Sequence, residues 1–294
     1  MELIPAKTII SGYATGSEWF GVNYNMNIYK GCSHGCIYCD SRSDCYRVED
    51  FDRVRAKAAA LAIIESELKS KQRKGVVGTG AMSDPYNPEE ALHCLTRGAL
   101  ALLDRYDFGV AIATKSDLVV RDIPLLEKIQ RHSPTLIKLT ITTADDALAA
   151  KIEAQAPPPS RRFEALRTLR EAGIFAGIIL MPVLPFITDS PENIRQIIEQ
   201  AADCGASFIY PAYGVTLRQN QRDHFLRQLH HHFPQQEAAY LRQFGNAYQC
   251  PSPRAAELDV CLKAACTAHG ILCQMPDIID AYTQPYRYLQ PPLF

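Results

Sequence analysis

Short β-branched runs alternate with longer amphipathic stretches over the first two thirds of the chain. The short runs indicate six buried strands: Asn25–Tyr29, Val76–Thr79, Val110–Ala113, Leu136–Ile141, Gly177–Met181 and Phe208–Tyr210. The longer stretches indicate five helices: Val54–Lys69, Glu89–Asp104, Pro124–Gln130, Arg162–Glu171 and Pro191–Cys204. Strands that alternate with helices are typical of βα units around a parallel sheet. We therefore expect an α/β fold, a partial (β/α)6 barrel of the TIM type.

The alternation ends near Val215, where polar helical sequence takes over. Three further helices are expected there: Gln221–His230, Glu237–Phe244 and Ala255–His269. Three prolines within Ala156–Pro159 indicate a loop that interrupts the repeat. We expect three segments along the chain: an N-terminal leader packed on the barrel at 1–24, the barrel at 25–214, and a helical C-terminal extension at 215–294.

Charge and composition restrict the function only weakly. The formal net charge is −1, which argues against a wide basic face for nucleic acid but leaves a local basic groove open. No apolar run is long enough to span a bilayer, and Met1–Gly12 lacks the apolar stretch of a secretory signal, so we expect a cytoplasmic location. Ten cysteines is a high number for that reducing compartment, where disulfides rarely persist.

Three of the cysteines form a compact motif. Cys32, Cys36 and Cys39 have the spacing C-x3-C-x2-C just after the first expected strand, and Gly31 and Gly35 let the backbone turn sharply there. In a parallel barrel this loop lies at the C-terminal end of the strands, where such folds place their chemistry. Three thiolates suit an iron–sulfur cubane that keeps one iron open for another ligand.

Other ligand sets compete with this interpretation. Structural zinc would need a fourth thiolate or imidazole, and His34 inside the loop is the candidate. A second cluster could use four C-terminal cysteines: Cys250, Cys261, Cys266 and Cys273. Their spacing matches no auxiliary-cluster motif, and free cysteine is among the most buried residue types, so we favour core packing for these four thiols.

The stretch Asn27–Cys39, which reads NIYKGCSHGCIYC, resembles the radical S-adenosylmethionine (SAM) superfamily, specifically its branch related to spore photoproduct lyase. The resemblance extends from about Ala6 to Asp189 and weakens after that. Further matches carry it, in order along the chain: Ser83–Glu89, Thr114–Ser116 with Arg121 and Asp122, Leu139–Thr143, Arg162–Leu166 and Pro182–Asp189.

The resemblance implies the chemistry of that superfamily. Cys32, Cys36 and Cys39 would ligate one [4Fe–4S] cluster, and its open iron would bind the amino and carboxylate groups of SAM. An electron from a donor such as flavodoxin or ferredoxin would cleave the S–C5′ bond, and the 5′-deoxyadenosyl radical would abstract hydrogen from a substrate. We take a monomer as the default oligomeric state.

Six side chains are expected to contact SAM: Tyr38, Ser83, Asp84, Lys115, Thr140 and Thr142. Tyr38, between the last two cysteines, offers stacking area for the adenine. Ser83 and Asp84 can accept hydrogen bonds from the methionine ammonium, and Lys115 can reach the carboxylate.

The remaining two contacts depend on strand geometry. Thr140 and Thr142 are two residues apart on a strand, so their hydroxyls share a face, where they could meet ribose or carboxylate oxygens.

The segment after Asp84 has a competing interpretation, because proline and asparagine form turns, and Tyr86 and Asn87 would then only shape the loop.

Two positions separate this chain from thymine-dimer repair. Spore photoproduct lyase uses a cysteine as hydrogen donor near the end of its second strand, whereas the resemblance puts Met82 there, and a thioether has no hydrogen to donate. Asp40 stands where relatives often carry an aromatic residue. The substrate stays unidentified: the family resemblance suggests a nucleic acid or nucleotide, and a peptide or protein is the alternative. A non-enzymatic redox sensor is less favoured, because the segments around Ser83, Asp84 and Lys115 are retained.

Overall fold

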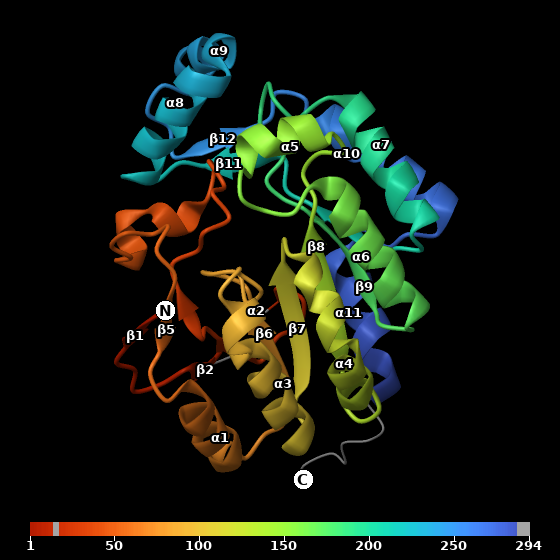
Figure 1. The fold of residues 1–294 in the computed structure, drawn as a ribbon. Helices are drawn as coiled ribbons and strands as arrows, with labels where there is room; N and C mark the ends of the chain where they lie inside the picture. The colour runs from red at the N-terminus through yellow and green to blue at the C-terminus, as the bar shows by residue number, and fades with distance from the viewer. Residues whose placement is uncertain (14–17, 287–294) are drawn as a thin grey trace.

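The computed structural model describes residues 1–13 and 18–286. Within them, the largest sheet has the strand order β10-β9-β8-β7-β6-β3-β2. Six neighbouring strands run parallel: β3 (Tyr24–Met26), β6 (Val76–Thr79), β7 (Gly109–Thr114), β8 (Thr135–Thr140), β9 (Ala176–Leu180) and β10 (Ile209–Pro211). β2 (Ile10–Gly12) pairs antiparallel with β3. All six expected strands are present, and the chain has the expected α/β fold of a partial barrel (Figure 1).

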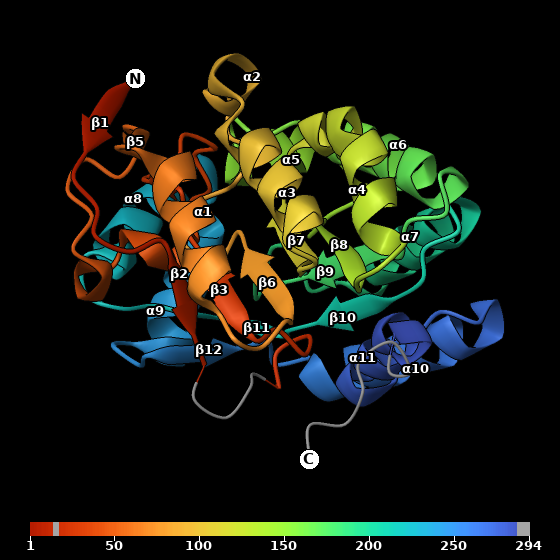
Figure 2. The same cartoon turned by 90° about the horizontal axis from the view of Figure 1, so that it is seen from below.

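Helices cover the outer face of this sheet (Figure 2). They are α1 (Ala60–Ser70), α3 (Leu95–Arg105), α4 (Ile123–Gln130), α6 (Pro159–Glu171) and α7 (Pro191–Asp203). Their apolar side chains form the main core with the outward residues of the strands, and Leu100, Ile112 and Ile197 have no exposed surface. Pro191 begins α7, as the expected range of this helix predicts, and Gly205, with a φ of +68°, follows its end.

The helix expected at 54–69 begins later than its pattern indicates. Its first residues form strand β5 (Arg55–Lys57), which pairs with β4 (Tyr29–Lys30) and with β1 (Glu2–Ile4). The expectation for these residues was wrong because the backbone hydrogen bonds of β5 go to distant strands, which a local pattern does not record.

The helix expected at 89–104 is broken at Cys94, which has a φ of +52°. α2 (Glu90–His93) precedes the break and α3 follows it. The carboxylate of Glu90 accepts hydrogen bonds from the N–H groups of Thr96 and Arg97 in the first turn of α3. This buried side chain stabilises the new helix start in place of a continuous helix.

Residues far apart in sequence fill the concave face of the sheet. Phe20, ahead of β3, packs there with Phe208, and it meets α11 (Met275–Thr283) through Tyr282. Lys138 of β8 is buried on the same face, with its Nζ atom 4.6 Å from the centre of the Phe20 ring. α11 was not expected from the sequence.

After β10 the chain leaves the barrel. β11 (Gly214–Thr216) and β12 (Gln249–Pro251) pair antiparallel, and α8 (Gln221–His232) and α9 (Pro234–Phe244) project between them as a helical hairpin (Figure 1). α10 (Ala255–His269) packs against α7. The three helices expected in this region are therefore present.

The division into segments at 24 and 214 stays a prediction, and 14–17 and 287–294 lie outside the described residues. The short 3-10 helices are η1 (Asp40–Arg42), η2 (Asp44–Tyr46), η3 (Asp117–Asp122) and η4 (Gln284–Tyr286). Over the described part of the chain, no helix combines the length and the apolar character that crossing a membrane requires.

Candidate active site

A cavity of about 460 Å³ opens at the C-terminal edge of the parallel sheet. Residues at five successive strand ends line it: Ser83 after β6, Lys115 after β7, Thr140 at the end of β8, Met181 after β9 and Ala212 after β10. Parallel strands end at the same edge of a sheet, so side chains that are distant in sequence meet here.

The cysteine loop closes one side of this cavity. Gly31 has a φ of +82°, and a Cβ atom there would lie 2.5 Å from the carbonyl oxygen of Arg53 and 2.7 Å from that of Phe51. Only glycine is compatible with this close approach. The N–H group of Cys32 donates to the Phe51 carbonyl at 2.8 Å, which joins the start of the loop to the chain beyond η2.

A helix that the sequence pattern did not predict supports the other end of the loop. α5 (Asp146–Ile152) ends beside it, and the N–H group of Ile37 donates to the last carbonyl of α5 at 3.0 Å. Cys36 forms an isolated antiparallel bridge with Glu153. The loop is therefore held by backbone hydrogen bonds at both ends.

The three thiols share one environment with a lysine. Cys32, Cys36 and Cys39 line the cavity together with Lys115. Burial raises the pKa of Cys36 and Cys39, and the Lys115 ammonium acts in the opposite direction. The pKa of Lys115 is raised, because Cys36, Glu153 and Cys39 outweigh the effect of burial. An ammonium in this place favours the thiolate form that metal ligands require.

An ion pair lies behind Cys32. The Nδ1 atom of His34 is 3.3 Å from Oδ2 of Asp84. Burial opposes the charge on both groups, yet their attraction raises the pKa of His34 to about 10 and lowers the pKa of Asp84 to about 2. Burial also raises the pKa of Cys32, but the hydrogen bonds and the positive charge of His34 together outweigh burial and lower the pKa below the ordinary value.

Ser83 and Asp84 line the cavity, but their oxygens already have partners in the protein. Asp84 Oδ1 accepts from Thr114 Oγ1 at 2.6 Å, and Asp84 Oδ2 accepts from the N–H group of Lys115 at 2.7 Å. Ser83 Oγ donates to the carbonyl of Gly31. Contacts of these two residues with the methionine ammonium stay a prediction.

The segment after Asp84 forms a hydrogen-bonded turn. The Asn87 side chain donates to the Asp84 carbonyl at 3.0 Å and accepts from the N–H group of Glu89 at 3.0 Å. The Tyr86 hydroxyl donates to Asp122 at 3.1 Å. These contacts agree with the interpretation in which Tyr86 and Asn87 shape the loop.

Tyr38 and Thr142 meet at a buried carboxylate that the sequence did not reveal. The Tyr38 hydroxyl donates to Oε1 of Glu153, and Thr142 Oγ1 lies 3.4 Å from the same oxygen. Tyr38 and Thr140 line the cavity, whereas Thr142 is not part of its wall. Glu153 pairs with Arg162, with 2.5 Å between Oε2 and Nη1. Arg162 belongs to a segment that carries the superfamily resemblance, but no sequence pattern singled out Glu153.

Gln221 is a second residue that the sequence analysis missed. Its side chain has no exposed surface and donates to the carbonyl of Tyr38 at 2.9 Å and to that of Thr216 at 2.7 Å. This side chain joins the start of α8 to the cysteine loop.

The donor set agrees better with a cubane than with zinc. His34, the candidate fourth zinc ligand, is paired with Asp84. Across residues 1–13 and 18–286, no three His, Cys, Asp or Glu side chains converge on the position of a single metal ion. A cubane binds each thiolate at a different iron, so it needs thiols placed around one cavity, as Cys32, Cys36 and Cys39 are.

The four C-terminal cysteines do not share one site. Cys250 lies in the small hydrophobic cluster beneath α8 and α9, whereas Cys266 lies in the main core with Cys273 packed against it. Cys261 is half-buried on α10. Their distribution agrees with packing roles.

Three further residues line the cavity: Trp19, Asp40 and Met82. Trp19 is 40% exposed, and its ring meets Phe20 and Tyr210 edge to face, with centroids 5.0 and 5.5 Å apart. The sequence analysis did not select Trp19, because an aromatic residue ahead of the first barrel strand carries no motif.

Known sequences match this chain mainly over the barrel. Residues 26–201 match the sequence model of the Radical SAM superfamily. An uncharacterized protein of Mycobacterium tuberculosis (strain ATCC 25618 / H37Rv) is 31% identical over 239 residues, which are 79% of this chain and 70% of the relative. An uncharacterized protein of Methanocaldococcus jannaschii is 32% identical over 169 residues, which are 58% of this chain and 63% of the relative.

Solved structures share the fold. Spore photoproduct lyase complexed with dinucleoside spore photoproduct has a TM-score of 0.65 at 13% identity, covering 91% of this chain and 79% of that one. The radical SAM methyltransferase TsrM from Kitasatospora setae, with tryptophan substrate and a SAM analog bound, has a TM-score of 0.55 at 13% identity, covering 82% of this chain and 51% of that one.

Proposed function

The chain belongs to the radical SAM superfamily, and on that premise we propose that it cleaves SAM reductively at Cys32, Cys36 and Cys39 and abstracts hydrogen from a substrate in the adjoining cavity. It is an enzyme of the radical SAM type, and its cofactors are a [4Fe–4S] cluster and SAM. The observation that carries the proposal is the meeting of three thiols and the Lys115 ammonium on the wall of one cavity at the C-terminal edge of the sheet.

When bound, the cluster supplies the single electron that opens the S–C5′ bond of SAM. The residues of this chain hold the reactants. Lys115 offers an ammonium to the methionine carboxylate, and Tyr38 offers aromatic stacking area to the adenine. The Thr140 hydroxyl meets the ribose, and Ser83 and Asp84 keep the strand end beside the methionine in place.

The test is anaerobic reconstitution with iron and sulfide, followed by reduction with dithionite in the presence of SAM. We expect 5′-deoxyadenosine and methionine from the native chain and neither from Cys36→Ala, which lacks one ligand. A chain that carries about four irons and yet releases no 5′-deoxyadenosine would contradict the proposal.

We propose a nucleic acid or nucleotide as the substrate class. Trp19 lines the cavity and is 40% exposed, and an accessible indole provides a face on which a base can stack. Support also comes from the shared fold of spore photoproduct lyase, whose solved complex contains a dinucleoside.

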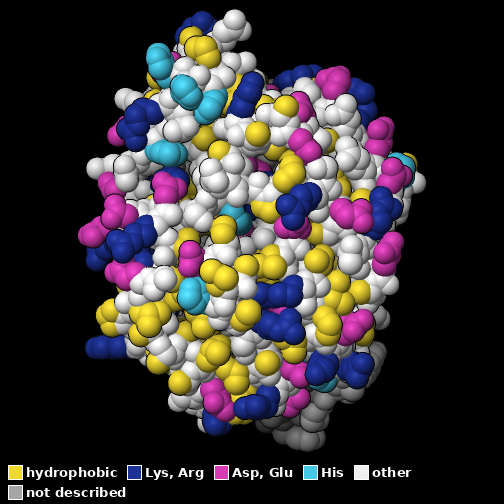
Figure 3. Space-filling model, in the orientation of Figure 1, with side chains coloured by type: hydrophobic (Ala, Val, Ile, Leu, Met, Phe, Trp, Pro, Cys, Tyr) yellow, Lys and Arg dark blue, Asp and Glu magenta, His cyan; other side chains and the backbone are white. Residues whose placement is uncertain are grey.

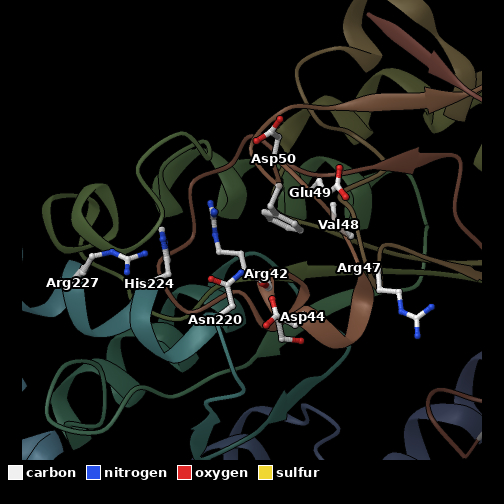
Figure 4. Close-up of a pocket in the computed structure, with 11 residues that line it drawn as sticks. Arg42, Asp44, Arg47, Val48, Glu49, Asp50, Asn220, His224 and Arg227 are labelled. Atoms are coloured by element: carbon white, nitrogen blue, oxygen red, sulfur yellow. Dashed lines mark hydrogen bonds between the residues drawn. The ribbon is translucent and has the colours of Figure 1, made fainter.

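A second cavity, of about 350 Å³, lies between α8 and the chain that follows the cysteine loop. Figure 4 shows Arg227, His224 and Arg42 along one wall, with Glu49 and Asp50 on the opposite side. Burial is the main reason that the pKa of His224 is lowered to about 4, and Arg42 acts in the same direction. The guanidinium groups of Arg42 and Arg227 on this wall support the binding of a phosphate, whereas charges of both signs are mixed over the face seen in Figure 3.

A basic peptide is the second candidate, favoured by three carboxylates on the same cavity: Asp44, Glu49 and Asp50. The two classes are distinguished by adding short oligonucleotides or peptides to the SAM cleavage assay. Molecules of the true substrate class should raise the rate of 5′-deoxyadenosine formation. A deuterated substrate should transfer deuterium to the 5′-deoxyadenosine. Stimulation by peptides alone would contradict a nucleotide substrate.

The reaction needs a reductant, and we propose a flavodoxin or ferredoxin acting on a monomer in the cytoplasm. None of the ten cysteines forms a disulfide, which supports a reducing compartment. Pull-down with the reduced donor and sedimentation analysis test the partner and the oligomeric state.

A further inference from the structure

A buried ion pair underlies the cysteine loop and has no part in the roles assigned above. Glu153 is 2% exposed and Arg162 is 0% exposed, and 2.5 Å separates Oε2 from Nη1. Removing two charges from water costs free energy that an apolar pair of similar size would not cost. The position of the pair beside the thiols suggests a reason for this cost.

Glu153 contacts the cysteine loop through both its side chain and its backbone. Its carboxylate accepts the Tyr38 hydroxyl, and its backbone forms the bridge with Cys36. Arg162 in turn is held by two carbonyls: Nε donates to Pro157 at 2.7 Å and Nη1 donates to Thr140 at 2.9 Å. The pair therefore links the end of β8 to the segment between the last two cysteines.

The charge of Glu153 also acts on the thiols. Lys115 faces Glu153, Cys36 and Cys39 and is attracted by all three. Its Nζ atom lies 5.5 Å from the centre of the Tyr38 ring, and both residues line the cavity. Because these groups are desolvated, water screens their interactions poorly.

We propose that Glu153 is a positioning residue for the cluster: with Arg162 as its counter-ion it fixes Tyr38 and the backbone at Cys36, and its negative charge lowers the reduction potential of the cluster. A negative charge near a cluster disfavours the added electron, so charge is a direct control on potential. The inference rests on the proposed ligation by the three cysteines, but it needs no particular substrate.

The test compares two single variants with opposite charge effects. Glu153→Gln removes a negative charge and keeps the shape, so the midpoint potential should shift upward. Arg162→Gln removes a positive charge and leaves Glu153 beside Lys115, so the potential should shift downward. Potentials are measured by redox titration of the reduced cluster signal in electron paramagnetic resonance. A purely structural role would move both potentials in the same direction or leave them unchanged.

The chain provides a matched control. Glu90 is a second buried carboxylate between a tyrosine and an arginine: it accepts from the Tyr29 hydroxyl and pairs with Arg121 at 2.7 Å. None of these three residues lines the cavity. Glu90→Gln should lower thermal stability and leave the midpoint potential at the native value.

Iron content is measured in the same samples, so that two failures can be told apart. A native chain without about four irons would contradict the cysteine ligation and the inference together. Loaded Glu153→Gln and Arg162→Gln proteins with potentials that do not move in opposite directions would overturn the inference alone.

Glu153→Asp keeps the charge and should restore the native potential. If Glu153→Gln is insoluble, a downward shift of Arg162→Gln relative to Glu153→Asp supports the inference, and no shift or an upward shift overturns it.

Discussion

The Nδ1 atom of His34 lies 3.3 Å from Oδ2 of Asp84, so an ion pair joins the cysteine loop to the end of β6. The two side chains are only 3% and 8% exposed. The same carboxylate also accepts from Thr114 and from the backbone of Lys115. The Asp84 side chain therefore connects three parts of the cavity wall: the end of β6, the cysteine loop and the end of β7.

Asp84→Asn should therefore destabilise the chain that lacks its cofactors. Losing a charge-assisted contact costs about 2 kcal/mol, which corresponds to a decrease in Tm of roughly 4–8 °C for a chain somewhat below this size. Scanning calorimetry measures the change. Asp104→Asn is the control, since it removes the partner of the more exposed His132, 3.1 Å away, and should cost less. Equal decreases in Tm would argue against a special role for the His34 pair.

Alanine at Cys32, Cys36 or Cys39 should abolish iron binding. The native chain should hold about four irons, and each variant should hold close to none after reconstitution. Cys273→Ser, which removes a half-buried thiol outside the cavity, should keep the native iron content. About eight irons in the native chain, or loss of half of them in Cys273→Ser, would indicate a second cluster instead.

Lys115→Met should weaken SAM binding. Loss of a charge-assisted hydrogen bond to the carboxylate should raise the KM for SAM by roughly 10–100-fold, with a smaller change in kcat. Initial rates of 5′-deoxyadenosine formation give both constants. Lys128→Met, an exposed position on α4, should leave them unchanged. An unaltered KM in Lys115→Met would remove this residue from the SAM site.

Lys138 should make stability depend on pH. Burial lowers the pKa of Lys138 from 10.5 to about 7. Between these values the unfolded chain binds a proton that the folded chain does not, so the free energy of unfolding should rise with pH from 7 to 10. Urea denaturation across this range measures the slope.

Lys138→Met should remove the contribution of this residue to the slope and should be more stable than the native chain at pH 7, despite the lost contact with Phe20. Lys128→Met, which alters an exposed lysine, should retain the native slope. A Lys138→Met protein with the native pH dependence would show that Lys138 titrates normally.

The local pattern of hydrophobic and polar residues was sufficient to predict most of the barrel. Buried parallel strands read as continuous β-branched runs, and all six were expected within a few residues of their observed limits. The cysteine motif and the glycines around it were equally visible, because Gly31 and Gly35 have positive φ angles that few other residues adopt.

Local pattern was insufficient where a side chain acts at a distance. The break at Cys94 depends on the Glu90 carboxylate, whose hydrogen bonds stabilise the start of α3. α11 is short, and its place on the concave face is decided by its contact with Phe20 near the other end of the chain. Neither contact produces a periodic pattern in the sequence from which it could be predicted.

The sequence by itself therefore determined the alternation of strands and helices, the superfamily resemblance and the three thiols, because each depends on residues that are close together in the sequence. Only the tertiary structure decided which charges meet around those thiols. It pairs Asp84 with His34 and brings Glu153 to Tyr38 and Arg162. The physical reason is that such contacts depend on how loops from separate strands converge, and burial makes the resulting charge interactions strong.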